Sequence, residues 1–226
     1  MGCRLYLEVP AEVILADATP GLTRLGAELA GTLDAADIAC VLLRSGDLAP
    51  ERLRAAVFAL RDPVQERDIA FLVEDDPALA AETGCDGVHL GSYGLCKAAR
   101  GRLGPEAVVG VGCGRSRHAA MVAGERGADY VGFGDPALPL EDAPEPASDE
   151  GVAEEFDLPA LLSWWQSLLT LPCVGFGART PDEAAAQAAA GADFVALGAS
   201  VWRDPEGPAA ALGAAARAIA SVRASC

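Results

Sequence analysis

Eight short apolar runs rich in Val, Ile and Leu recur along this chain, and most of the intervals between them hold a stretch rich in Ala and Leu. The runs are nearly continuous in apolar residues, which is typical of strands that are covered on both faces. Strands that alternate with helices run parallel and are joined by crossover helices. We therefore predict a single α/β domain, a parallel (β/α)8 or TIM barrel, with strands at residues 5–9, 38–43, 69–73, 87–90, 108–111, 129–133, 173–176 and 194–197.

An internal repeat, G-x-D-x-V-x-x-G, marks three of these runs, at residues 84–91, 127–134 and 191–198. Its first glycine fits the left-handed position that ends a helix, its aspartate begins the strand, and its last glycine leaves the end of the strand without a side chain. Three strands should therefore open onto the barrel end where sites of this fold lie. A doubly wound open sheet is the alternative, but no run is followed by G-x-G-x-x-G with the required helix and acidic partner.

The length of 226 residues suits one barrel, so we assign residues 1–226 to one domain. Pro50, Pro77 and the Thr180-Pro181 pair mark helix starts. Residues 135–157 form an insert between the sixth strand and its helix, rich in Asp and Glu and without Lys or Arg. We interpret this insert as a lid over the site or as a solvated segment.

The charge of the chain limits its partners. A formal net charge of −16 disfavours nucleic acid and anionic lipid, which are bound chiefly through clustered Lys and Arg. No apolar run is long enough to span a membrane and no signal-peptide pattern is visible, so we expect a cytoplasmic protein. Trp164 and Trp165 are expected to pack in the core or between copies of the chain, which makes a homo-oligomer one expectation.

The last two strands carry the clearest ligand signal. Glycine-rich turns let backbone N–H groups approach an anion, and a helix that begins there adds partial positive charge. We predict that a phosphorylated small molecule binds at these two loops, although the glycines alone would also suit tight turns. The predicted phosphate-binding residues are Gly175, Gly177, Ala178, Arg179, Gly198, Ala199 and Ser200.

Four arginines follow predicted strand ends: Arg44, Arg115, Arg179 and Arg203. A guanidinium offers paired donors that match phosphate oxygens. The set therefore indicates a phosphate site, and Arg115 is included in our prediction. The alternative is that these arginines balance an acidic surface.

The motifs at residues 87–91, 127–134, 172–178 and 191–201 resemble, in order and spacing, those of thiamine phosphate synthase and its TenI relatives, and the resemblance covers residues 5 to about 220. It implies a (β/α)8 barrel and a Mg²⁺-dependent transferase. The family joins hydroxymethylpyrimidine pyrophosphate to thiazole phosphate: pyrophosphate leaves, and the thiazole nitrogen attacks the resulting carbocation. This chemistry needs charge neutralised on the leaving group.

Carried over residue by residue, the resemblance places the family's pyrophosphate-binding arginine at Arg44 and a metal ligand at Asp75, with Glu74 beside it as a substitute ligand for Mg²⁺. The family's flanking Gln and Lys become Leu42 and Gly46, and its second metal carboxylate falls on Gly94. After the sixth strand, the acidic insert stands where the family keeps a lysine that faces phosphate. We therefore expect an insert that is disordered or folded away from the pocket, and little or no thiamine phosphate formation.

Two other hypotheses remain. In the TenI branch the acid/base histidine would fall on Asp135, which then needs a pKa raised toward neutrality. His89 belongs to the fourth strand's motif and is interpreted as a wall residue of the barrel, with ligand contact as the alternative. The third hypothesis is a barrel that binds a phosphorylated ligand without turning it over.

Overall fold

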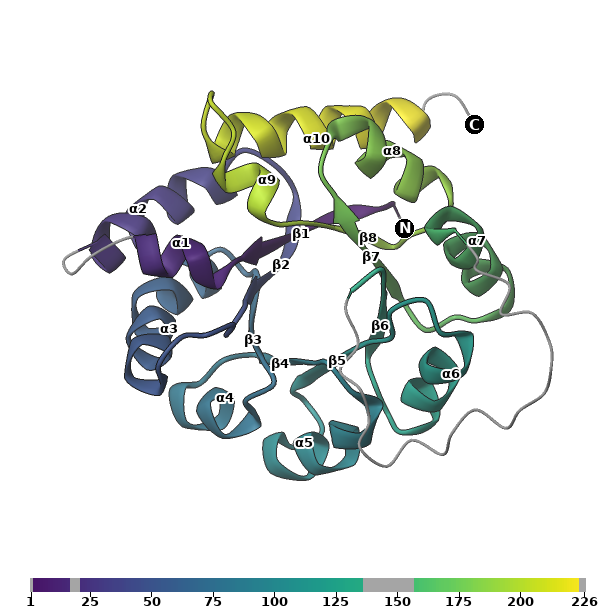
Figure 1. Cartoon of the computed structure of the whole chain (residues 1–226), viewed down its shortest axis with the longest axis horizontal. Helices are drawn as coiled ribbons and strands as arrows, with labels where there is room; N and C mark the ends of the chain where they lie inside the picture. Colours follow the sequence, from purple (N-terminus) through teal and green to yellow (C-terminus); the bar gives the residue numbers. More distant parts are fainter. Residues whose placement is uncertain (1, 17–20, 136–156, 224–226) are drawn as a thin grey trace.

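The structure, a computed structural model, describes residues 2–16, 21–135 and 157–223. Its eight strands close into one barrel in chain order. Every neighbouring pair is parallel, and β1 pairs with both β2 and β8. Figure 1 looks along the barrel, with the strands at the centre and the helices in a ring around them. The strands are β1 (Arg4–Val9), β2 (Ile38–Leu43), β3 (Ala70–Glu74), β4 (Gly87–Leu90), β5 (Val108–Gly112), β6 (Tyr130–Phe133), β7 (Cys173–Ala178) and β8 (Phe194–Leu197). The predicted fold is confirmed, and each predicted strand overlaps an observed one.

The helices lie outside the strands and begin at the expected signals. Pro50, Pro77 and Pro181 each stand in the first turn of a helix. The Thr180 hydroxyl accepts a hydrogen bond from the Glu183 N–H at 3.2 Å. No described helix combines the length and apolar character that crossing a membrane requires. The helices are α1 (Ala11–Ala16), α2 (Gly21–Leu33), α3 (Pro50–Gln65), α4 (Pro77–Thr83), the 3₁₀ helix η1 (Tyr93–Leu95), α5 (Cys96–Leu103), α6 (Arg117–Glu125), α7 (Leu158–Leu168), α8 (Pro181–Ala189), α9 (Ala199–Trp202) and α10 (Pro208–Arg223).

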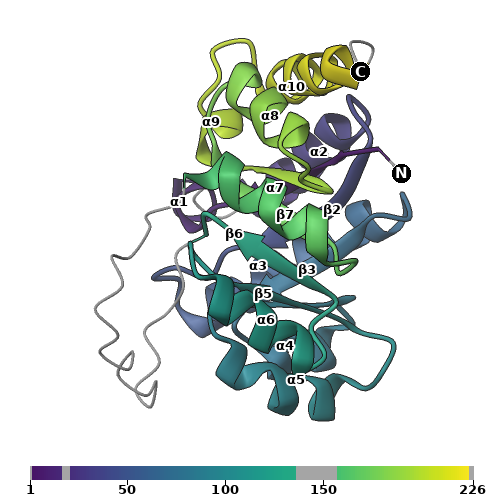
Figure 2. The same ribbon diagram turned by 90° about the vertical axis from the view of Figure 1, so that its right-hand side faces the viewer.

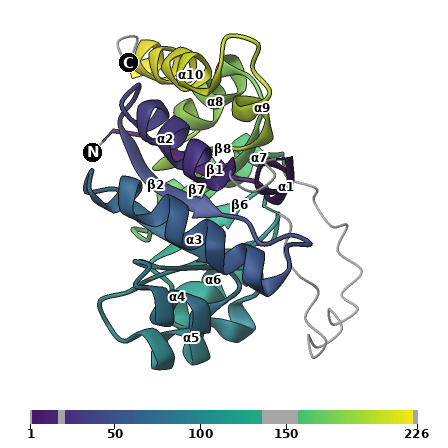
Figure 3. The same ribbon diagram turned by 90° about the vertical axis from the view of Figure 1, so that its left-hand side faces the viewer.

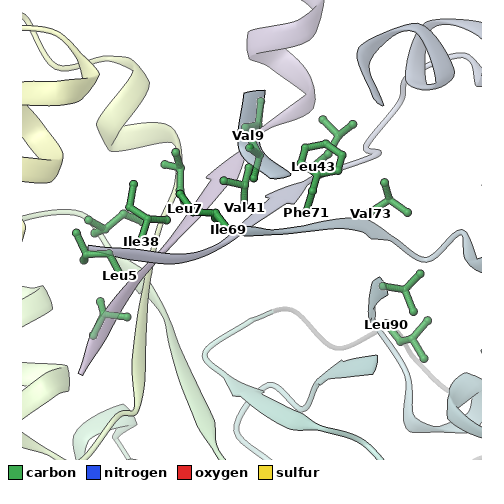
Figure 4. Close-up of a cluster of buried hydrophobic side chains, with 14 of the residues drawn as sticks. Leu5, Leu7, Val9, Ile38, Val41, Leu43, Ile69, Phe71, Val73 and Leu90 are labelled. Atoms are coloured by element: carbon green, nitrogen blue, oxygen red, sulfur yellow. The ribbon is translucent and has the colours of Figure 1, made fainter. Parts of the chain in front are cut away.

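Successive side chains of each strand point into two different buried layers. In β1, Leu5, Leu7 and Val9 point outward and pack with residues of the neighbouring strands and helices, in the cluster that Figure 4 shows in part. A smaller cluster fills the inside of the barrel, made of Tyr6, Cys40, Leu42, Leu72, Tyr130, Val174, Phe176 and Ala196. Both faces are buried, which explains why the strands read as nearly continuous apolar runs.

The repeated G-x-D motif forms the joint that starts three strands. Its first glycines, at positions 84, 127 and 191, have φ of 72°, 86° and 103°, the left-handed conformation expected of them. Each aspartate accepts a hydrogen bond from the backbone of the preceding strand: Asp86 from Phe71 N at 2.7 Å, Asp129 from Val109 N at 2.7 Å and Asp193 from Cys173 N at 2.9 Å. The motif therefore ends a helix and ties the strand to a neighbour.

The two ends of the barrel differ. In Figures 2 and 3 the N-terminus lies at one end, and α1 and α9, which directly follow β1 and β8, lie at the other. That second end holds the carboxyl ends of the strands, where residues following each strand converge. We call it the mouth of the barrel.

Candidate active site

Charged side chains replace apolar ones as the strands reach the mouth. Tyr6, Leu42 and Leu72 belong to the cluster inside the barrel. The residues two positions further along are charged, and because side chains alternate along a strand they face the same way. They border a cavity of about 580 Å³ that is lined, among others, by Glu8, Arg44, Glu74, Asp75, Asp135 and Phe176.

Arg44 is the centre of this cavity's charge network. Its Nε donates to Glu8 Oε1 at 2.6 Å and its Nη1 to Glu74 Oε1 at 2.7 Å. Its Nη2 donates to Asp135 Oδ1, and its Cζ lies 5.3 Å from the centre of the Phe176 ring. The side chain of Arg44 is 18% exposed, against 14% for Glu8 and 2% for Asp135. A single, largely buried guanidinium therefore joins β1, β3 and the segment after β6.

Burial and charge oppose each other in this network. Burial disfavours the charged form of Arg44, but Glu8 and Asp135 outweigh it, so the pKa of the guanidinium lies above its ordinary value. Burial raises the pKa of Glu8, which Arg44 only partly offsets. Burial also acts on Glu74 and Asp135, but hydrogen bonds and the charges of their partners prevail, so the pKa of each carboxyl lies below its ordinary value.

Asp135 is held by His89 as well as by Arg44. His89 is fully buried, and its Nε2 lies 2.8 Å from Asp135 Oδ2 while its Nδ1 lies 2.8 Å from the Tyr130 hydroxyl. Both ring nitrogens are occupied, so His89 is a wall residue of the barrel in this structure, and its predicted contact with ligand finds no support. The depressed pKa of Asp135 is the opposite of the shift that the acid/base role requires.

Asp75 and Glu74 border the same cavity at the end of β3. Asp75 has a left-handed backbone with φ of 50°, and its Oδ1 accepts a hydrogen bond from Gly91 N at 2.8 Å. Burial raises the pKa of Asp75, against the effect of that hydrogen bond. Glu74 Oε2 accepts from Ser45 N at 2.9 Å and from Ser45 Oγ at 3.0 Å. The described residues contain no cluster of three or more His, Cys, Asp or Glu side chains placed to hold a metal ion.

A pair of carboxylates nevertheless suits Mg²⁺. This ion keeps several waters and commonly uses one or two protein carboxylates together with substrate phosphates. The oxygen donors of Asp75 and Glu74 fit that pattern, although Arg44 and Ser45 already engage both oxygens of Glu74. Asp75 is therefore the better candidate ligand of the two.

The predicted phosphate loops meet at the mouth between β7 and β8, where Arg179, Thr180 and Ser200 line a small cavity of about 60 Å³. Gly177 lines the larger cavity and has φ of 84°. Two backbone N–H groups in these loops already donate within the protein: Arg179 N donates to Glu183 Oε2 at 2.7 Å, and Val201 N donates to the Gly198 carbonyl at 3.0 Å. Phosphate binding at these loops stays a prediction. Gly175 and Ala178 are buried in β7, and Gly198 and Ala199 lead into α9.

The four arginines do not converge. Arg44 lines the mouth cavity, whereas Arg115, Arg179 and Arg203 are not among the described residues that line it. Arg115 and Arg179 are exposed. Arg203 pairs with Glu12 at 3.5 Å, with side-chain exposures of 72% and 57%. The described structure therefore does not gather all four arginines around one cavity.

The remaining predictions concern the core and the insert. Trp165 is buried, and its Nε1 donates to the Leu171 carbonyl at 2.8 Å, which confirms a packing role.

Of the acidic insert, residues 136–156 lie outside the described residues, so the predicted disorder or position of this segment stays a prediction. Its first residue, Asp135, lies in the mouth rather than away from it. Its last, Asp157, accepts from Ala160 N at 2.9 Å and caps α7.

The sequence-based prediction of the site missed three residues of this region: Glu8, Tyr6 and Tyr130. Glu8 has a recognisable signal, because it lies two positions after Tyr6 and so faces the same side of β1. The hydroxyls of Tyr6 and Tyr130 lie 2.9 Å apart although 124 positions separate them in the chain. That contact depends on the closed barrel, and no local sequence pattern predicts it.

The chain is similar to known proteins along most of its length. The family model for thiamine monophosphate synthase matches residues 14–201. The chain belongs to this family. Among its relatives in the family, the thiamine-phosphate synthase of Rhodospirillum centenum is 44% identical over 211 residues, which are 93% of this chain and 94% of the relative. That of Hyphomonas neptunium is 38% identical over 220 residues, covering 92% of this chain and 90% of the relative.

The fold similarity agrees with this family. The structure of thiamine phosphate pyrophosphorylase from Pyrococcus furiosus matches with a TM-score of 0.74 at 20% identity, over 97% of this chain and 96% of that one. The (S)-3-O-geranylgeranylglyceryl phosphate synthase of Thermoplasma acidophilum matches with a TM-score of 0.63 at 15% identity, over 96% of this chain and 93% of that one. At such identities these structures support the barrel fold alone.

Proposed function

We propose that this chain is a transferase of the thiamine phosphate synthase type, which joins hydroxymethylpyrimidine pyrophosphate to thiazole phosphate and releases pyrophosphate. The observation that carries the proposal is that Arg44, Glu74 and Asp75 border one cavity at the mouth of the barrel. These are the residues that the family resemblance assigns to pyrophosphate and metal. The names of the relatives that cover most of the chain support the same activity.

In this proposal the chain's task is to neutralise charge on the leaving group. As the bond between the pyrimidine methylene carbon and the pyrophosphate oxygen breaks, its electron pair stays on the oxygen, and a fixed guanidinium stabilises that charge. Arg44 is already oriented by carboxylates from two strands, so little reorganisation accompanies the step. The thiazole nitrogen then forms the new C–N bond with its lone pair.

Asp75, with Glu74 beside it, would hold Mg²⁺, which would further neutralise the departing pyrophosphate. The thiazole phosphate would bind at the loops after β7 and β8, near Gly177, Ala199 and Ser200. The short helix α9 begins there, at residue 199. Phe176, whose ring faces Arg44, would supply an apolar wall between the two substrates.

The test is a direct assay with both substrates and Mg²⁺. We expect thiamine phosphate to form, and both a chelator and Asp75→Asn to abolish the metal-dependent rate. Asp62→Asn is the matched control, since Asp62 lies on α3 with a side chain 60% exposed. If the unmodified chain forms no product under these conditions, the proposal fails and a barrel that only binds its ligand remains. Turnover unaffected by chelator and by Asp75→Asn would exclude the metal role.

The acidic insert leads to the opposite expectation, little or no product, and the same assay decides between the two. An ordinary turnover of about 1 s⁻¹ or more would overrule the argument from the insert. The isomerase hypothesis is the weaker alternative, because the pKa of Asp135 is shifted down. Location in the cytoplasm and assembly into a homo-oligomer stay predictions.

A further inference from the structure

A chain of hydrogen bonds crosses the inside of the barrel and ends at the active-site guanidinium. The hydroxyls of Tyr6 and Tyr130 lie 2.9 Å apart, the Tyr130 hydroxyl lies 2.8 Å from His89 Nδ1, and His89 Nε2 lies 2.8 Å from Asp135 Oδ2. Asp135 Oδ1 accepts from Arg44 Nη2. Tyr6, Tyr130, His89 and Asp135 are all buried. The chain therefore runs from the apolar interior to the mouth without contact with bulk water.

The direction of these hydrogen bonds follows from the carboxylate at their end. Burial raises the pKa of Asp135, but its partners lower it below the ordinary value, so Asp135 is ionised and only accepts. His89 Nε2 must then carry a hydrogen to reach Asp135 Oδ2. If Nδ1 carries none, it accepts from the Tyr130 hydroxyl. Tyr130 in turn accepts from Tyr6. The geometry thus places a hydrogen on His89 Nε2, the atom that faces the Asp135 carboxylate.

Missing side chains on β5 and β6 make room for this chain. A Cβ at Gly112 would lie 2.7 Å from Asp135 Oδ2 and 3.3 Å from His89 Nε2. A Cβ at Gly132 would lie 2.7 Å from Phe176 Cε2 and 3.4 Å from His89 Cε1. The two spacings of 2.7 Å are too short for a packed Cβ, so Gly112 leaves room for Asp135 to meet His89, and Gly132 leaves room for the Phe176 ring.

We infer that His89 and Tyr130 are positioning residues of this site: they fix the carboxylate of Asp135, and Asp135 in turn fixes the guanidinium of Arg44 above Phe176. Asp135 contacts both nitrogens at the end of the guanidinium, Nη1 at 3.4 Å and Nη2 more closely. Glu8 and Glu74 hold Arg44 from other strands, each through a single oxygen, and that of Glu8 lies 2.6 Å from Nε and 2.5 Å from Nη2. Asp135 engages the guanidinium with both carboxylate oxygens and fixes its plane together with Glu8, and the buried chain of hydrogen bonds fixes Asp135. The inference rests on the proposed function only for the ligand that Arg44 meets.

The test uses two disrupting variants, each with a matched control. Tyr130→Phe removes the hydroxyl that holds His89, whereas Tyr6→Phe removes an equally buried hydroxyl and leaves the bonds from Tyr130 to Asp135 intact. Gly112→Ala pushes on the flexible end of Asp135, whereas Gly101→Ala adds a methyl group where nothing lies within 4 Å. For each variant we would measure unfolding by urea, the affinity for inorganic pyrophosphate with MgCl₂ by calorimetry, and the ring ¹⁵N and arginine Nε–H resonances by NMR.

We expect a hydrogen on His89 Nε2 in the unmodified chain, with His118→Gln used to assign the only two histidines. Tyr130→Phe and Gly112→Ala should move the Arg44 Nε–H resonance and weaken pyrophosphate binding about tenfold, the scale expected when a binding group is misplaced. Tyr6→Phe and Gly101→Ala should change the affinity by less than about twofold. His89→Gln, which keeps an N–H donor for Asp135, should bind pyrophosphate more tightly than His89→Leu.

Two results would overturn the inference. One is a His89 ring in the unmodified chain that carries its hydrogen on Nδ1 and none on Nε2. The other is an Arg44 resonance that is unchanged in Tyr130→Phe and Gly112→Ala while both variants remain folded. The NMR measurements are made without ligand, so they separate this inference from the proposed function. If pyrophosphate does not bind and no product forms, the proposed function fails, and the tautomer and the Arg44 resonance still decide the positioning role.

Discussion

Replacing Arg44 by methionine should destabilise the fold more than breaking an ordinary ion pair does. Methionine keeps much of the volume but removes the charge that Glu8, Glu74 and Asp135 share. The exposures of these three carboxylate side chains are 14%, 20% and 2%, so water replaces little of the lost interaction. Removing one partner of a buried pair costs about 3–5 kcal/mol. For a chain of this length that corresponds to a fall in Tm of about 6–20 °C.

The loss of stability in Arg44→Met should also depend on pH. Burial acts to raise the pKa of Glu74 and of Asp135, but their partners lower each pKa below its ordinary value near 4. Carboxyls of this kind stabilise the fold fully above that ordinary value, and the stabilisation disappears as pH falls through the lower folded-state pKa. Without Arg44 this contribution is absent, so the difference in unfolding free energy between Arg44→Met and the unmodified chain should shrink as pH falls from about 7 to below about 4.

Urea unfolding followed by circular dichroism at several pH values measures both the destabilisation of Arg44→Met and its change with pH. Arg54→Met is the matched control, because the pair of Arg54 with Glu82 is exposed, at 45% and 56%. Such surface pairs contribute at most about 1 kcal/mol. The reasoning is refuted if Arg44→Met costs no more than Arg54→Met at neutral pH, or if its cost does not change with pH.

Three further outcomes are expected. Asp86→Ala should lower the unfolding free energy by about 1–3 kcal/mol, because the N–H of the buried Phe71 then loses its acceptor. Urea unfolding measures this, and an unfolding free energy equal to that of the unmodified chain would contradict the structural role of the repeat. Gly31→Ala should raise it by about 0.5–1 kcal/mol, since Gly31 lies in α2 with nothing within 4 Å of the added carbon; a destabilised variant would refute this. Burial raises the pKa of the Cys113 thiol to about 12, so Cys113 should resist thiol reagents at pH 8 until urea unfolds the chain, which peptide mass spectrometry can follow; rapid labelling of the native chain would count against it.

The fold could be predicted from the sequence because each of its signals is local. Burial on both faces makes a strand such as β2 a continuous apolar run, and the predicted boundaries 38–43, 87–90 and 194–197 match the observed ones. The glycine and aspartate of the repeat mark the joints by conformation and by hydrogen bonding. The order of strands in a closed parallel barrel then follows the order of the chain.

The site could be predicted only in part. Arg44, Glu74 and Asp75 directly end or follow strands, so their place at the mouth was predictable, and the structure puts them around one cavity. The charged partners that set the pKa of these residues could not be predicted from the sequence. Arg44 meets Glu8, 36 positions away, and Asp135, 91 positions away, only because the barrel closes. His89 illustrates the difference: its strand was predicted correctly, but whether it faces a ligand or Asp135 depends on β6.

The charge of the mouth links these observations to the metal requirement of the proposed reaction. Among the described residues that line the cavity, five carry a carboxyl group and one, Arg44, carries a guanidinium. At about 4 Å, like charges repel by about 1 kcal/mol in water and by about 4 kcal/mol near a protein surface. Arg44 is already shared among three of the carboxyls, so it cannot alone offset a pyrophosphate with several negative charges. A divalent cation that entered with the pyrophosphate would change this balance, and Asp75 is the carboxyl that would hold it. The acidic mouth is therefore compatible with pyrophosphate chemistry only as a site for the metal complex of the substrate, and free pyrophosphate should bind much more weakly than its Mg²⁺ complex.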